Sequence, residues 1–158
     1  MNTSQHFAVA LAVIVFAAIS INLPAQDQKT SAHLQGDQAS AVGCLRSINT
    51  AEAYYQKQYK IGWSPTLASL GVPQEGTKPS ASAAGVLDNS LTGGKRNNYV
   101  FIYIAGKPDA SGKISTYAVT ASPAKWREGM WSFFTDDTGI IRGTAENRPA
   151  RASDPPLR

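Results

Sequence analysis

Apolar residues recur at steps of three or four in residues 39–59, and this pattern constrains the fold more than any other feature. On a helix of 3.6 residues per turn, such positions form one apolar stripe. The stripe consists of Val42, Leu45, Ile48, Tyr55 and Tyr59, and Ala51 shares the position of Glu52 in it. Ser40 can cap the start of the helix, while Gly62 and then Pro65 mark its end. Because a single stripe must be buried, this helix needs a packing partner.

Four short segments after the helix have the composition of β-strands. Residues 99–105 (YVFIYIA) are apolar on both faces, as in a central strand. Residues 114–121, 130–135 and 140–142 are the other predicted strands, with a turn at 136–139 (DDTG). We expect neighbouring strands to pair in order as an antiparallel meander. Helix and sheet then bury each other's apolar face, which predicts an α+β fold with an N-terminal amphipathic helix on about four strands.

The remaining segments divide the chain around one domain. Residues 26–38 are polar and patternless, which indicates a flexible linker. Residues 65–70 predict a short second helix, and residues 85–91 predict a turn or one helical turn. Residues 143–158 are polar and rich in proline, so we expect a disordered tail. The folded domain is therefore expected to span residues 39–142.

Residues 7–21 (FAVALAVIVFAAISI) form an apolar run interrupted only by Ser20. The run is shorter than the roughly 20 residues that a membrane-spanning helix needs. Residues 1–25 therefore predict a signal peptide cleaved after Ala25, or else a retained N-terminal anchor; a buried core helix is the third alternative. The first two lead to export, to the periplasm or the extracellular space, with attachment to the inner membrane if the segment is retained.

Catalytic chemistry is scarce in this sequence. Its two histidines, His6 and His33, lie in the targeting segment and the linker, and Cys44 is the single cysteine. No intrachain disulfide can form, and the usual zinc ligand sets are lacking. We expect Cys44 to be buried as a small apolar residue. We therefore predict a non-enzymatic protein without a cofactor; a small hydrolase is the less favoured alternative, because no Gly-x-Ser-x-Gly motif occurs.

Charge and carboxylates give two further expectations. The net charge is +4, but the basic residues are scattered, which argues against a nucleic-acid partner.

Asp136 and Asp137 lie in the predicted hairpin turn, where aspartate favours local backbone hydrogen bonds. Together with Asp88 they are weak candidates for a cation site, since calcium needs several oxygens around one point. The alternative is a plain turn.

Five segments occur in an order that matches a known family. They are RSINTAEAYYQKQY (46–59), IGWSPTLASLG (61–71), GVLDNSLTGGKRNNYVFIY (85–103), STYAVTASP (115–123) and GMWSFFTDDTGIIR (129–142). This series, over residues 44–142, resembles the globular part of bacterial type IV pilins and type II secretion pseudopilins. The resemblance implies a pilin-head-like fold. It also implies a function through protein–protein interaction in the cell envelope, with another envelope protein or with a pilus or secretion assembly.

The N-terminal segment departs from the family pattern. Pilins of this family carry a short basic leader ending in glycine, and their mature chain has a glutamate at its fifth position. Residues 1–26 contain no glycine, glutamate, lysine or arginine. We therefore expect a pilin-like head behind an ordinary signal peptide or anchor, with membrane contact only through that segment if it is uncleaved. The alternative is a free-standing secreted or periplasmic binding module for an unrelated ligand.

The strand at residues 99–105 carries the candidate partner surface. Alternate side chains point to opposite faces of a strand. The aromatic face consists of Tyr99, Phe101 and Tyr103, and the aliphatic face of Val100, Ile102 and Ile104. The resemblance implies that the aromatic face packs on the helix, which leaves the aliphatic stripe open to a partner. Trp126, in the loop at 122–129, is a further candidate residue of the partner surface. The alternative is that this loop covers the stripe.

Overall fold

A computed structural model describes residues 25–157 of the chain, with the side chains of residues 35–157. The predicted targeting segment therefore lies outside the described residues, apart from Ala25. The helical elements are α1 (Ala25–Tyr59), the 3₁₀ helix η1 (Leu67–Leu70) and α2 (Asn89–Thr92). The strands are β1 (Lys95–Arg96), β2 (Tyr99–Ala105), β3 (Tyr117–Pro123), β4 (Ser132–Asp136) and β5 (Arg142–Thr144). Within the described part of the chain, none of the helices has the length and apolar content to cross a membrane.

Helix α1 is longer than the periodic pattern alone indicates. It begins at Ala25, so residues 26–38 are helical. The prediction that they form a flexible linker is therefore wrong. The reason is local: this segment has four glutamines with one Lys, one Ala and one Leu, all good helix formers, and it contains no proline. Ser40 lies inside α1 instead of capping it. The predicted end at Tyr59 is confirmed, because Lys60 and Gly62 adopt positive φ values of 58° and 90°.

The five strands form one antiparallel sheet in the order β1-β2-β3-β4-β5. The predicted strand at 99–105 is confirmed as β2, while β3, β4 and β5 begin two or three residues later than expected. β3 starts late because Ile114 forms bridges to Gly62 and Pro108 instead. Strand β1 was not predicted. It pairs with β2 across Asn97 and Asn98, whose φ values of 46° and 62° suit a two-residue hairpin turn.

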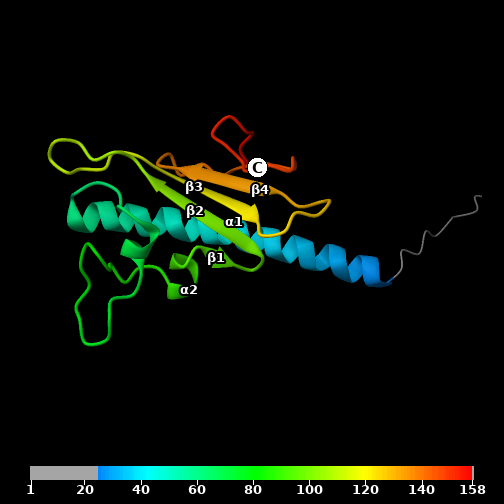
Figure 1. The fold of residues 1–158 in the computed structure, drawn as a ribbon, viewed down its shortest axis with the longest axis horizontal. Coiled ribbons are helices and arrows are strands. Elements are labelled where there is room, and N and C mark those ends of the chain that lie inside the picture. The colour runs from blue at the N-terminus through cyan, green and yellow to red at the C-terminus, as the bar shows by residue number, and fades with distance from the viewer. Residues whose placement is uncertain (1–24, 158) are drawn as a thin grey trace, which may run out of the picture.

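Helix α1 runs along one face of this sheet and extends past it at its N-terminal end (Figure 1). The contact between them is the core of the protein. It combines aliphatic side chains of α1 with aromatic ones of the sheet, including Leu45, Ile48 and Tyr55 with Tyr99, Phe101 and Phe133. The prediction of an α+β fold, with a helix packed on an antiparallel sheet, is thereby confirmed.

Two short helical turns complete that side of the sheet. The predicted short helix at 65–70 is η1, which Thr66 caps by accepting a hydrogen bond from the Ser69 N–H at 3.2 Å. For residues 85–91, where a turn or one helical turn was predicted, the structure has the helical turn α2, which begins at Asn89 and is capped by Asp88. Both turns bury one or more leucines against the core, including Leu70 and Leu91.

Residues 143–157 are packed against the sheet, which corrects the disordered tail expected over 143–158 for the part that the structure describes. Residues 142–144 are strand β5, and the chain then returns along β5, where Pro156 forms an antiparallel bridge with Arg142. The Gly143 N–H donates to the Pro155 carbonyl at 3.1 Å, and the Leu157 N–H donates to the Ile141 carbonyl at 2.9 Å. Arg148 forms an ion pair with buried Asp154 at 2.6 Å. The proline-rich segment after β5 therefore has little regular secondary structure and covers the outer edge of β5. We call this segment the C-terminal strap.

Candidate binding surface

A buried carboxylate fastens α1 to the loop that follows it and to strand β2. Glu52 is fully buried, and its Oε2 accepts a hydrogen bond from the Ser64 N–H at 2.9 Å. Its Oε1 accepts from the hydroxyls of Ser64, at 2.5 Å, and Tyr103, at 2.7 Å. Sequence reasoning treated Glu52 as a gap in the apolar stripe. The structure makes it the polar centre of the core, where three donors offset the loss of solvent.

Tyr103 is held in place from two sides. Its ring stacks on Tyr117, with centroids 5.8 Å apart and planes at 11°. Burial, together with the neighbouring Glu52, raises the pKa of its hydroxyl, although the adjacent Ser64 side chain acts in the opposite direction. The phenol therefore stays protonated and donates to the carboxylate. Since alternate residues of a strand point oppositely, fixing Tyr103 toward the helix turns Ile102 and Ile104 outward.

The aliphatic stripe lies on the sheet face opposite α1. Ile102 is 53% exposed and Ile104 is 61% exposed, whereas Val100 is half-buried. Their neighbours on β3 are small: Ile102 lies opposite Thr120, and Ile104 lies opposite Ala118. Small neighbours leave most of each isoleucine in solvent. The predicted orientation, with the aromatic face inward and the aliphatic face outward, is what the structure has.

Trp126 does not join this stripe. It is half-buried and packs against the core cluster formed with α1. The loop that carries it is joined to the β1–β2 turn, where the Ala124 N–H donates to the Asn98 carbonyl at 2.7 Å. The exposed fractions of Ile102 and Ile104 show that this loop leaves them uncovered.

The candidate cation ligands are used locally. Asp88 accepts hydrogen bonds from Ser90 and from the Leu91 N–H, and it pairs with Arg96 at 2.7 Å. These partners, the Ser90 hydroxyl first and Arg96 next, lower the pKa of Asp88 to about 2. Asp136 accepts from the Thr138 N–H at 3.0 Å, as in an ordinary Asx turn. No group of three or more His, Cys, Asp or Glu side chains capable of holding a metal occurs in the described residues, so the structure does not gather Asp88, Asp136 and Asp137.

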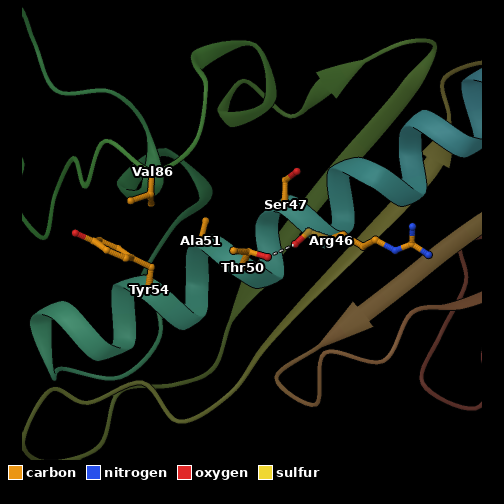
Figure 2. A pocket seen from close by; sticks show the side chains of 6 residues that line it. All are labelled: Arg46, Ser47, Thr50, Ala51, Tyr54 and Val86. Atoms are coloured by element: carbon orange, nitrogen blue, oxygen red, sulfur yellow. Dashed lines mark hydrogen bonds between the residues drawn. The ribbon is translucent and has the colours of Figure 1, made fainter.

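A hollow of about 480 Å³ lies beside the exposed side of α1 (Figure 2). Its lining residues are Arg46, Ser47, Thr50, Ala51, Tyr54 and Val86. The two hydroxyls are engaged by the helix itself, because Ser47 donates to the Gly43 carbonyl and Thr50 to the Arg46 carbonyl. Figure 2 shows Tyr54 and Val86 at one end of this group of side chains, while Arg46 points away from them along the helix. The hollow has the form of a shallow binding groove, with no acid–base pair among its lining residues.

Two further residues bear on chemistry. Cys44 is 6% exposed, as predicted, and burial raises the pKa of its thiol, which makes the thiolate scarce.

Asn49 was missed by sequence reasoning. Its amide donates to Thr135 Oγ1 at 2.9 Å and to the Gly139 carbonyl at 3.2 Å, and its carbonyl accepts from the Tyr117 hydroxyl at 2.9 Å. The available signal was weak: asparagine is a poor helix former in the middle of a helix.

Comparison with known proteins adds no relative: no protein-family model matches the chain, and neither the curated proteins nor the solved structures yielded a match.

Proposed function

We propose that this protein is a non-enzymatic, exported, pilin-like protein that acts by protein–protein contact in the bacterial cell envelope, in a pilus or secretion assembly. The observation that carries the proposal is the aliphatic stripe on the open sheet face. Ile102 and Ile104 are each more than half exposed, next to each other on the same face of β2. Contiguous exposed apolar side chains mark contact surfaces in soluble domains.

The architecture supports the pilin-head-like part of this proposal. A long helix packs on an antiparallel sheet, and the segments that resemble pilins form its elements in the same order. The chemistry of the described residues supports binding over catalysis. The Ser64–Glu52 pair, which joins a hydroxyl to a carboxylate, is fully buried and out of reach of a substrate. No cofactor and no nucleic acid enter the proposal.

Export depends on the apolar run at residues 7–21. The mature N-terminus tests it directly. The full chain is produced in a bacterium, and the protein is recovered from cytoplasmic, membrane, periplasmic and medium fractions and measured by mass spectrometry. A chain beginning at Gln26 in the periplasm or medium would establish cleavage after Ala25. A full-length chain in the inner-membrane fraction would establish the anchor. A full-length chain in the cytoplasm would rule out export.

The contact surface is tested by placing a charge on it. Ile102→Asp should keep the fold and abolish cross-linking to envelope proteins in the native bacterium, because a carboxylate on the stripe would have to be desolvated in the contact. Val72→Asp is the matched control, since Val72 is also an exposed aliphatic residue, at 55%. Circular dichroism checks the fold of both variants. An unchanged set of cross-linked partners in Ile102→Asp would contradict the proposal.

The second candidate function is a free-standing binding module for an unrelated ligand. The hollow of about 480 Å³ beside α1, with half-exposed Tyr54 at its rim, favours it. Tyr54→Ala separates the two functions. If this variant loses its ligand while Ile102→Asp does not, the hollow is the working site and the sheet surface is not.

A further inference from the structure

Strand β2 has one edge that is only partly paired. In an antiparallel sheet the N–H and C=O of one residue point to the same neighbouring strand, and those of the next residue point to the other. The Gly106 N–H donates to Thr116 of the β3 side at 2.8 Å, whereas the Phe101 N–H donates to Gly94 of the β1 side at 2.8 Å. Even-numbered residues of β2 therefore bond to β3. Tyr103 and Ala105 direct their backbone groups toward the β1 side.

Strand β1 is too short to reach these groups. It pairs Lys95 with Val100 and Arg96 with Tyr99, and the Gly94 carbonyl adds one bond to Phe101. On the N-terminal side of Gly94 the chain belongs to α2 and leaves the sheet. Among the described residues, no strand lies beside Tyr103 and Ala105 on that side, because β1 is the edge strand. The backbone N–H and C=O groups of Tyr103 and Ala105 therefore face an open edge of the sheet, where a further strand has room to pair with them.

The opposite edge of the sheet is treated differently. There the C-terminal strap bonds to β5 and its flank through Pro155 and Leu157. Exposed edges recruit other strands, and proteins usually cover them. Because the β5 edge of the sheet is covered and the edge of β2 at Tyr103 and Ala105 is open, β2 is the place where a strand can be added.

The surroundings of the open edge define what kind of strand fits. On the helix side, a hollow of about 300 Å³ adjoins the edge. Its lining residues include Pro65, Thr66, Thr92, Gly94, Phe101 and Tyr103. On the other side lies the stripe of Ile102 and Ile104. An added strand would therefore point small polar side chains into the hollow and apolar ones alongside the stripe, in strict alternation.

Charge argues against a second copy of this chain as the occupant. Exposed lysines flank the edge: Lys95 precedes it on β1, and Lys107 and Lys113 lie in the loop after β2. The one acid of that loop, Asp109, has its carboxylate bound by the Ser111 hydroxyl and by the N–H groups of Ser111 and Lys113. Antiparallel pairing of two β2 edges would bring like charges together, whereas acidic residues at the ends of a partner strand would complement them.

We propose that the free edge of β2 at Tyr103 and Ala105 binds an extended segment of a partner protein by strand addition. The segment alternates apolar with small polar residues and has acidic flanks. This inference rests on the proposed function, since it states how an envelope partner would be held. Backbone hydrogen bonds supply the attachment, and the alternating side chains supply the selectivity.

The probe is a synthetic peptide, acetyl-Glu-Thr-Val-Thr-Val-Thr-Glu-amide, added to the mature protein. Amide hydrogen exchange is followed by NMR. We expect the Tyr103 and Ala105 amides to exchange fast in the free protein and about tenfold more slowly with peptide, since only hydrogen-bonded amides are protected. The Ile102 and Ile104 amides should be protected in both states. A peptide with proline at its central position should give no protection, because proline lacks the N–H.

Two protein variants complete the test. Ala105→Pro removes one outward N–H at an edge position that tolerates proline, so it should fold and fail to bind the peptide. The double variant Lys107→Glu, Lys113→Glu leaves the edge intact. It should lose the acidic peptide and instead bind the version with lysine at both ends.

Three results would overturn this inference. One is protection of Tyr103 and Ala105 in the free protein; another is peptide binding that Ala105→Pro and the charge reversal leave unchanged. The third is protection that appears without peptide as protein concentration rises, which would show a second copy on the edge. Failure here is distinct from failure of the proposed function. If the peptide does not protect the edge but Ile102→Asp still removes the envelope partners, the sheet-face contact stands without strand addition.

Discussion

The hydroxyl of Tyr103 donates a hydrogen bond of 2.7 Å to Oε1 of Glu52, and this contact ties the aromatic face of β2 to helix α1. The same carboxylate also holds Ser64, at the start of the loop that leads to η1. One buried acid thus sets the position of three segments that are distant in sequence. The outward orientation of the Ile102 and Ile104 stripe follows from it.

Glu52→Gln should lower the free energy of unfolding by about 2–3 kcal/mol, because the amide nitrogen puts a donor where Ser64 and Tyr103 already donate. Urea unfolding measures the change. Glu128→Gln is the control, since Glu128 is an exposed carboxylate in a loop. Equal stability of the two variants would contradict the anchoring role of Glu52.

Asn49→Ala should destabilise the protein by about 2 kcal/mol, because it leaves Thr135 and the Tyr117 hydroxyl without a partner in a partly buried site. Ser47→Ala, two residues away on the same helix, is the control. Ser47 is exposed and bonds only to its own helix backbone, so its loss should have little effect. Thermal unfolding of both variants distinguishes the polar bridge from a general effect on α1.

Two adjacent residues of β2 should lose very different amounts of stability on truncation. Phe101 is 5% exposed, and Phe101→Ala should cost about 3–5 kcal/mol through lost burial and a residual cavity. Ile102 is 53% exposed, and Ile102→Ala should cost less than about 1 kcal/mol. Denaturant unfolding of both variants tests which face of the strand the helix covers. A large loss for Ile102→Ala would mean that the stripe is buried.

The C-terminal strap should respond to acid. The Arg148 guanidinium beside Asp154 lowers the pKa of that carboxyl from 3.8 to about 2 in the folded protein. A carboxyl with a lowered folded-state pKa stabilises the fold above its unfolded pKa, and this contribution is lost as the pH falls. The melting temperature should therefore decline between about pH 4 and pH 2. Asp154→Asn should show a shallower decline. Asp88, whose pKa is also lowered to about 2, first by the Ser90 hydroxyl and then by Arg96, accounts for part of the remainder.

Much of the secondary structure was predictable because it depends on local patterns. The helix end at Tyr59, the bounds of β2 and the order of the strands follow from periodicity and turn residues. The helical segment at 26–38 was mistaken for a linker because it lacks an apolar stripe, although it has four glutamines and no proline. The ordered structure of the C-terminal segment was not predicted, because its proline-rich composition resembles that of disordered chains. The Arg148–Asp154 ion pair and the hydrogen bonds to β5, which hold this segment, exist only in the folded state.

The sequence by itself determined that one helix precedes a set of short strands, that β2 has an aromatic and an aliphatic face, and that Cys44 belongs to the apolar side of α1. These properties depend on side-chain spacing along one element. Only the tertiary structure decided that the aliphatic face stays open, that Glu52 and Asn49 bridge the helix to the sheet, and that one sheet edge is covered while the other is free. Those properties depend on contacts between residues up to about ninety positions apart, such as Asn49 with Gly139. Spacing along a single element does not report such contacts.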